Sequence, residues 1–393
     1  MNAFLALFFS IMFVIGTDTF LIAPLLPALQ GLFHISTELS GWMVGAYALG
    51  YAVFALIAGP LSDGWNRKTV MLFGMLGFSV ATILCGTATG FWSMFLYRFL
   101  AGICAAFVSP QVWATIPALF PVPKIAKAMG IAAAGLAVSQ AFGVPIGSLL
   151  ASVHWSYPFF VIGACSLLLA IAIFFAMPDM RPNPGHGEMG PLWKRYLPLW
   201  TNCVARGAFL AYFLFQLGNF AAFAFIGKWM TDRFHLSIGQ VGYVMMFLGL
   251  GNLLGSMTSA YVLSAISRFR AMLAGLVFLA CCFVVLPYLP SVSVVAGAYF
   301  LIFTLLGILF PLMMGLLTSL NPAIRGTISS LANSVMYAAT TLGSWIAGLL
   351  YAAFRGFFAV AVFTAVCFVA ALAAFIASGA LRMQEKPKRE LAP

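Results

Sequence analysis

The residue whose type and surroundings best suit it for chemistry is Asp18, which lies within a long apolar segment. The other seven acidic residues all fall in connecting segments: Glu38, Asp63, Asp179, Glu188, Asp232, Glu385 and Glu390. An apolar environment disfavours a charged carboxylate, and a nearby cation favours it. Movement of such a cation, or of water, would therefore switch proton uptake and release at Asp18. The alternative is a structural role, in which a permanently charged Asp18 pairs with a cation or caps a kink near Pro24.

Arg98 is the candidate partner, because it also lies within an apolar segment. An arginine inside a membrane span costs about 2.5 to 3.5 kcal/mol on insertion scales, so it must face a polar interior or a partner. Asp18 and Arg98 lie about ten and about six residues from the same end of their spans, which at ~1.5 Å per residue places them within a few ångström in depth. We predict that they form a proton-coupling pair. The alternative for Arg98 is an anchor whose side chain reaches the membrane surface.

The composition supplies the membrane-spanning helices that would position these two residues. The chain of 393 residues is 63% hydrophobic and 7% charged, too little polar surface to cover a soluble globule. Apolar stretches of about 20 residues, each able to cross a hydrocarbon core of about 30 Å, recur along it. We predict an all-α membrane protein of twelve spans, near residues 4–28, 40–61, 70–89, 92–117, 129–151, 157–177, 201–227, 239–263, 271–289, 295–318, 328–351 and 357–380.

The basic residues indicate how these spans are oriented. If the N-terminus is cytoplasmic, Lys228, Arg233 and Arg355 lie outside, Arg98 and Arg206 lie within spans, and the other lysines and arginines lie inside. This asymmetry follows the positive-inside rule. We therefore expect a multi-pass protein of the bacterial cell (inner) membrane with both termini cytoplasmic. The net charge of +11 then reflects orientation and contact with membrane lipids, with no nucleic-acid partner.

The chain also contains an internal repeat. A shift of 201 residues overlays Phe33-His34-Ile35-Ser36 on Phe234-His235-Leu236-Ser237, and a shift of 200 overlays Gly143–Leu150 on Gly343–Leu350. Such a repeat predicts two pseudo-symmetric six-helix halves. The expected divisions are a bundle at 1–177, a cytoplasmic linker at 178–199, a bundle at 200–380 and a cytoplasmic tail at 381–393. The repeat places Asn219, a neutral isostere, opposite Asp18.

The segment between the second and third predicted spans, Gly59-Pro60-Leu61-Ser62-Asp63-Gly64-Trp65-Asn66-Arg67-Lys68, resembles the signature loop of the major facilitator superfamily. The resemblance implies the twelve-helix fold of that family and a gate made by Gly59, Asp63, Arg67 and Lys68. Glycine allows close helix approach, and a carboxylate can meet a helix N-terminus, here that of the eleventh span. The alternative is a charged turn that only fixes topology.

Two positions of this loop depart from the family pattern. Gly64 stands where a basic residue is usual, so the charge network is thinner. Asn66 stands where glycine is usual, and we expect it to keep the turn because Asn tolerates the left-handed conformation.

Two further motifs fit the same family. Tyr97-Arg98-Phe99-Leu100-Ala101-Gly102 resembles the Arg-x-x-x-Gly motif of the fourth span. Gly143, Pro145 and Gly147 form a Gly-x-Pro-x-Gly element similar to the one found in antiporters of the family, in a variant associated with the branch that exports sugars, nucleosides and purines beside drugs. This resemblance implies proton-coupled efflux by alternating access. The same small residues would also suit simple bundle packing, without bearing on direction.

The candidate substrate-binding residues are polar or aromatic side chains within the spans. They are Tyr47, Tyr51, Gln111, Trp113, Gln140, Tyr212, Gln216, Asn219, Asn252, Asn333 and Tyr337. Each could instead join helices to one another. Because these stripes hold no further acid or base, we expect a small-molecule substrate that is neutral, weakly polar, or anionic through Arg98.

Other classes of protein fit the sequence less well. A polytopic membrane enzyme would need a nucleophile or base with an orienting partner, and no such motif occurs, while a channel would need a repeated filter or a charged ring. The seven cysteines lack metal-ligand spacing. We expect a monomer that is not an enzyme and uses neither cofactor nor metal, with substrate and protons as its partners. Proton-coupled import or passive facilitation remains the main alternative to export.

Overall fold

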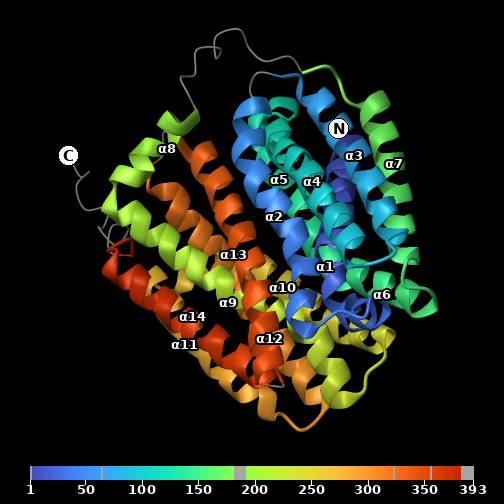
Figure 1. Ribbon diagram of the computed structural model, residues 1–393. Helices are drawn as coiled ribbons and strands as arrows, with labels where there is room; N and C mark the ends of the chain where they lie inside the picture. Colours follow the sequence, from blue (N-terminus) through green and yellow to red (C-terminus); the bar gives the residue numbers. More distant parts are fainter. Residues whose placement is uncertain (1, 63–64, 181–191, 322–323, 355, 382–393) are drawn as a thin grey trace.

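The computed structural model describes residues 2–62, 65–180, 192–321, 324–354 and 356–381. Throughout these ranges the chain is built from helices, twelve of which are long and apolar enough to cross a membrane. The predicted all-α membrane fold is therefore confirmed. Figure 1 shows the helices of the first half, blue to green, gathered on one side, and those of the second half, yellow-green to red, on the other.

The first half contains six spans. They are α1 (Asn2–Leu32), α2 (Thr37–Ser62), α3 (Arg67–Gly86), α4 (Phe91–Leu119), a composite span, and α7 (Tyr157–Ala176). The composite span joins α5 (Val122–Val138), a π-helical turn η1 (Ser139–Gly143) and α6 (Val144–Val153). A π-turn widens a helix locally, and this one ends at Gly143, the first residue of the predicted antiporter-like element.

The second half repeats the pattern. Its spans are α9 (Cys203–Phe234), α10 (Ile238–Ala265), α11 (Arg268–Val285) with a short 3-10 turn η3 (Leu286–Tyr288), α12 (Val292–Ser319), α13 (Arg325–Ala353) and α14 (Phe357–Ala377). A short helix, α8 (Leu192–Thr201), precedes them and overlaps the segment predicted as a linker. The domain boundaries themselves stay a prediction.

The internal repeat has a clear structural counterpart. His34 and His235, which the shift of 201 aligns, have φ values of 51° and 55° and are the non-glycine residues with positive φ in the described chain. Histidine is among the few residues that adopt this conformation, which here reverses the chain after α1 and after α9. The same shift aligns the first residues of α3 and α11, Arg67 and Arg268, behind the side-chain caps Asn66 and Ser267. The two halves therefore share their local chain geometry.

The halves meet chiefly through three contacts: α2 with α13, α1 with α9, and η1 and α6 with α10. Glycines allow the helices to approach so closely that an added Cβ would meet the partner helix. These are Gly41, Gly45 and Gly348 between α2 and α13, Gly227 on α9 against α1, and Gly242 and Gly249 on α10 against α6 and η1. All lie toward the predicted outer ends of their helices. The structure is therefore closed on the side that the sequence predicts to be outside.

Candidate functional site

Asp18 and Arg98 form a buried ion pair between α1 and α4. Arg98 Nη1 donates to Asp18 Oδ2 across 2.6 Å, and the two side chains are 1% and 0% exposed. The predicted proximity of the two residues is confirmed. The alternative in which Arg98 reaches the membrane surface is wrong, because its guanidinium lies inside the helix bundle. Asp18 Oδ1 is buried and has no hydrogen-bond partner in the described chain, so it is the carboxylate oxygen left to accept a proton.

Two glycines bring α4 close enough to α2 to set Arg98 in place. Gly102, the last residue of the Arg-x-x-x-Gly motif, lies against the backbone carbonyl of Tyr47, and Gly50 on α2 lies against the carbonyl of Phe99. One turn before Gly102, the Arg98 guanidinium carbon lies 4.7 Å from the centre of the Tyr47 ring. A cation over an aromatic face is a favourable contact. The motif thus packs two helices and positions its arginine together.

Tyr47 connects this pair to α1 as well. Its hydroxyl forms a hydrogen bond of 3.1 Å with the hydroxyl of Thr19, the residue that follows Asp18. Thr19 also bonds to the carbonyl of Ile15, one turn earlier on the same helix. Asp18, Arg98 and Tyr47 are therefore held by contacts among α1, α2 and α4.

The aromatic contacts continue from Tyr47 into the second half. Tyr337, on α13, stacks on Tyr51 with ring centres 3.8 Å apart and planes 25° apart, and its ring centre is 6.3 Å from that of Tyr47. Close by, the Thr341 hydroxyl lies 3.3 Å from the carbonyl oxygen of Gly45. Tyr47 therefore links the buried ion pair to Tyr337, which lies at the contact between the halves.

A second polar link between the halves joins Gln140 and Asn252. Asn252 Nδ2 on α10 donates to Gln140 Oε1 in the π-helical turn across 2.5 Å. Gly249, one turn before Asn252, leaves room for the backbone at Gln140 and Ala141. Both residues belong to the predicted substrate-binding set, and the structure brings them together.

The remaining predicted substrate-binding residues are more dispersed. On α9, Gln216 Nε2 donates to the Tyr212 hydroxyl across 2.9 Å, and both side chains are buried. Gln111 on α4 is buried, and its Oε1 has no hydrogen-bond partner in the described chain. Trp113, Asn219 and Asn333 are partly buried. The predicted set therefore forms several polar groups rather than one continuous stripe.

Sequence reasoning missed an aromatic cluster at the interface of the halves. Phe223 on α9 lies 5.5 Å from Phe20 on α1 and 6.2 Å from Phe303 on α12, measured between ring centres. Together with Gln140, Val144, Met245 and Leu248, these rings line a small residual cavity of about 10 Å³. Phenylalanines in apolar spans resemble any lipid-facing residue, so no signal in the sequence singled them out.

Part of the predicted gate, including Arg67 and Lys68, lies within the described residues. Asp63 lies outside the described residues, and Gly59 is part of α2, although what surrounds it is not described. The Arg67 guanidinium donates to the carbonyl of Ala114 on α4, and Lys68 Nζ lies 5.6 Å from the Phe174 ring of α7. These two basic residues fasten the loop to the helices of their own half.

The expectation of a left-handed turn at Asn66 is wrong. Asn66 has φ −63° and ψ 115°, and its side chain caps α3 by accepting from the backbone N–H of Lys68 across 3.1 Å. The same Oδ1 accepts from the N–H of Met180. Capping is a common role for asparagine in extended backbone, and it explains why glycine is not needed here.

The antiporter-like element packs against α1 beside the ion pair. A Cβ added at Gly143 would overlap the Thr17 side chain, and one at Gly147 would meet Leu21. Pro145 is the second residue of α6, which follows the π-helical turn directly. The element therefore holds the fifth span against the helix that carries Asp18.

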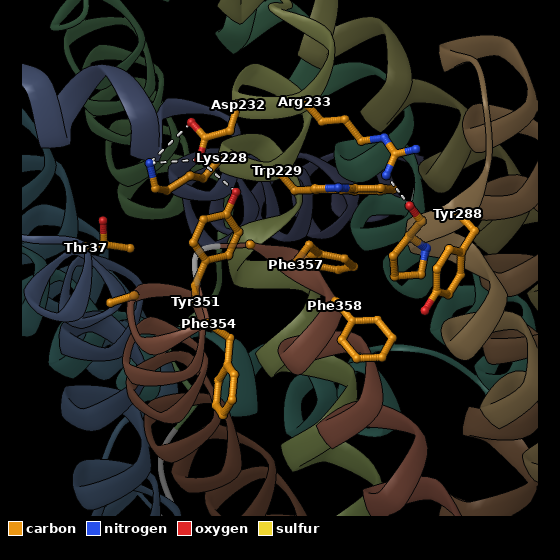
Figure 2. Close-up of a pocket in the computed structure, with 13 residues that line it drawn as sticks. Thr37, Lys228, Trp229, Asp232, Arg233, Tyr288, Tyr351, Phe354, Phe357 and Phe358 are labelled. Carbon is orange, nitrogen blue, oxygen red and sulfur yellow. Dashed lines mark hydrogen bonds and ion pairs between the residues drawn. The ribbon is translucent and has the colours of Figure 1, made fainter.

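A larger cavity lies on the predicted outer face of the second half (Figure 2), and Asp18, Arg98 and Tyr47 are not among the residues that line it. It has a volume of about 620 Å³, and Trp229, stacked on Phe357 at 4.6 Å, forms part of its wall. Asp232 accepts from the Tyr351 hydroxyl across 2.7 Å and pairs with Lys228 at 3.1 Å. Arg233 donates to the carbonyls of Pro287 and Leu289. The charged side chains of this cavity bind one another or the backbone. They therefore stabilise the outer corner of the second half.

These features, twelve spans in two repeated halves with a buried charge pair inside the first half, define a membrane transporter fold, and the comparisons agree. The Major Facilitator Superfamily model matches residues 8–343 and 208–393. The chain is 51% identical to an uncharacterized MFS-type transporter, YceJ, of Bacillus subtilis (strain 168), over 92% of this chain and 93% of that protein. The chain therefore belongs to the major facilitator superfamily.

Two more distant likenesses complete the comparison. Multidrug resistance protein 1 of Bacillus subtilis (strain 168) is 27% identical over 68% of each chain. Among solved structures, a D-xylose–proton symporter superposes with a TM-score of 0.81 at 16% identity, covering 95% of this chain and 97% of that one. The structural likeness supports the fold.

Proposed function

We propose that this transporter exports a small organic molecule in exchange for protons by alternating access, with Asp18 as the proton carrier. The observation that carries the proposal is the fully buried Asp18–Arg98 pair, whereas the Lys228–Asp232 pair lies near the end of α9, where the Asp232 side chain is 44% exposed. A carboxylate can carry a proton only if its charged and neutral forms are both reachable. Arg98 stabilises the charged form, and burial stabilises the neutral form, so opening of the site decides between them.

The direction of transport rests on two supports. The Gly143, Pro145 and Gly147 element, whose sequence resembles that of the antiporter branch, packs the fifth span against α1. Several relatives carry the names of resistance or export proteins, including a chloramphenicol resistance protein and a tetracenomycin C resistance and export protein from Streptomyces. Proton-coupled import is the second candidate, favoured by the likeness to a proton symporter structure.

The site favours an uncharged substrate. Arg98 is bound to Asp18, faces the Tyr47 ring and is buried, so its charge is not exposed to an anionic group in this structure. The groups of the two halves that meet at the interface are the Gln140–Asn252 amides and the rings of Phe20, Phe223 and Phe303. Amides and aromatic rings suit a neutral solute with apolar parts and a few hydrogen-bonding groups.

Purified protein in proteoliposomes tests the proposal. Chloramphenicol, puromycin, D-xylose and adenosine serve as a panel of probes, with an imposed pH gradient and a dye that reports proton movement. We expect at least one probe to move against its gradient with counterflow of protons. Asp18→Asn, which copies the Asn219 of the other half, should still bind that probe but fail to drive it uphill. Uphill, pH-driven transport by well-folded Asp18→Asn protein would refute the assignment of Asp18.

A further inference from the structure

We propose that Tyr47 and Tyr337 are the positioning residues through which the charge state of Asp18 acts on the contact between the two halves. This inference rests on the proposed function, since it assumes that Asp18 gains and loses a proton. It goes further by naming the side chains that pass this event on. Asp18, Arg98 and Tyr47 all belong to the first half, and Tyr337 is the first residue of the second half in the same chain of contacts.

Arg98 is the direct partner of Asp18. Its guanidinium has two partners in the described chain: the Asp18 carboxylate at 2.6 Å and the Tyr47 ring at 4.7 Å. When Asp18 is neutral, the attraction between two opposite charges is lost, and Arg98 donates to an uncharged carboxyl group, which is a weaker contact. The cation then depends more on the face of Tyr47. Because the pair is sealed from solvent, Arg98 cannot exchange Asp18 for bulk water without a movement of the helices.

The contacts of Tyr47 limit how it can move. Its backbone is fixed by Gly102, which lies against its carbonyl, so α2 cannot slide along α4 at this level. Its hydroxyl is bound to Thr19. A change in the position of Arg98 is therefore absorbed by the ring of Tyr47, which turns within its contacts with Tyr51 and Tyr337, at 6.5 and 6.3 Å.

Tyr51 and Tyr337 connect the first half to the second. Tyr51 and Tyr337 are stacked at 3.8 Å, so the two rings share one contact surface and a displacement of either alters it. Tyr337 lies on α13, whose contact with α2 is one of the three that join the halves. Protonation of Asp18 thus changes the free energy of the α2–α13 contact, which is the condition for coupling a proton to alternating access.

The ionisable surroundings of Asp18 are few. Besides Arg98 on α4, the groups of the described chain that act electrostatically on Asp18 are Tyr47 on α2 and Cys85 on α3. The other helices packed on α1, namely α5, α6, α7, α9 and α10, contribute no acid or base to this environment within the described ranges. Within the described ranges, Asp18 is therefore the carboxylic acid that acts on Arg98 and Tyr47, and its titration is the one that the proposal invokes.

The test measures the spacing of α2 and α13 as a function of pH. Full-length protein carries p-acetylphenylalanine at positions 57 and 327, near the predicted inner ends of the two helices. Nitroxide labels are attached to these two residues, and double electron–electron resonance measures the distance between them. This labelling keeps all native cysteines. We expect a distance distribution that shifts with pH, that loses the shift in Tyr337→Leu and Tyr47→Leu, and that keeps it in Tyr337→Phe, which retains the ring.

Trp345→Leu is the matched control. Trp345 also connects α13 to α2, through Trp42 at 6.1 Å, yet it has no contact with the ion pair. Its variant should weaken the same helix contact and still show the pH-dependent shift. If Tyr337→Leu keeps the full shift while Asp18→Asn loses it, the tyrosines do not transmit the signal and the proposed function stands. If Asp18→Asn itself keeps the shift, Asp18 is not the proton carrier, and both proposals fall.

Discussion

Gly102 on α4 lies against the backbone carbonyl of Tyr47 on α2, so closely that a side chain at Gly102 has no room. The residue one turn earlier, Arg98, lies over the Tyr47 ring and reaches Asp18. The spacing of arginine and glycine in this motif is therefore the spacing of one helical turn, which lets one residue bring the helices together while the other uses the resulting proximity.

The first prediction follows from this contact. Gly102→Leu should force α4 away from α2, at a cost typical of overpacking, about 1–3 kcal/mol, and should abolish proton-coupled transport. Gly297→Leu on α12 is the control, since a Cβ there meets nothing within 4 Å and the site is exposed. Thermal unfolding in detergent and transport in proteoliposomes measure the two effects. Equal behaviour of the two variants would contradict the role assigned to Gly102.

The second prediction concerns the buried pair. Arg98→Met leaves the Asp18 carboxylate without its cation and should lower stability by about 3–5 kcal/mol. The double variant Asp18→Asn, Arg98→Met removes both charges and should recover most of that stability, although not uphill transport. Unfolding midpoints of the single and double variants test this. If the stability lost in the double variant equals the sum of the losses in Asp18→Asn and Arg98→Met, the two side chains do not stabilise each other.

At this site, some contacts could be predicted from the sequence and others could not. The pairing of Asp18 with Arg98 was predictable, because depth in the membrane follows from counting residues along each span. The contacts of Tyr337 were not, since they depend on how the two halves rotate against each other, which helical period does not determine. The Phe20–Phe223–Phe303 cluster was hidden for another reason: apolar residues in apolar spans look the same whether they face lipid or a partner helix.

The third prediction addresses the outer closure. A Cβ at Gly348 would lie 2.8 Å from the Glu38 carbonyl oxygen, so Gly348→Leu should push α13 away from α2 and favour opening on the predicted outer side. A cysteine placed at Ser40, which is fully buried here, should then react with an impermeant thiol reagent added to intact cells. The parent protein should protect it. Protection that persists in Gly348→Leu would mean that this glycine does not maintain the closure.

The fourth prediction concerns the outer corner of the second half. Tyr351→Phe removes the hydroxyl that donates to Asp232, which should cost about 1 kcal/mol of stability because Asp232 is partly exposed and keeps its pairing with Lys228. Transport should be reduced only modestly, since Asp18, Arg98 and Tyr47 are not among the residues that line this cavity. Tyr288→Phe, at an exposed ring of the same cavity, is the control. Complete loss of transport in well-folded Tyr351→Phe would assign this corner a direct role.

The fifth prediction is the orientation, on which the words inner and outer depend. Cysteines introduced near position 187 should be shielded from impermeant reagents in intact cells, whereas cysteines near Phe234 should react. The basic residues support this arrangement. The reverse pattern of labelling would invert the topology and the sites assigned to each side.

The helices themselves were easier to predict than their details. All twelve spans occur, because sustained apolar character is an unambiguous signal, but their ends differ by several residues, as for the first span, which runs from Asn2 to Leu32 instead of 4–28. Asn66 shows a second limit: its residue type fits both a left-handed turn and a helix cap, and only the position of its neighbours decides.

The π-helical turn at Ser139–Gly143 explains an irregularity in the repeat. The two halves align at an offset of 201 residues up to the fourth span and at 200 from Gly143 onward, so the first half carries one additional residue. A π-turn accommodates one added residue without rotating the rest of the helix. Gly143 accordingly packs on α1 just as Gly343 packs on α9. The insertion is confined to the turn that contains Gln140, so removing one residue there should regularise the fifth span while displacing the amide that meets Asn252.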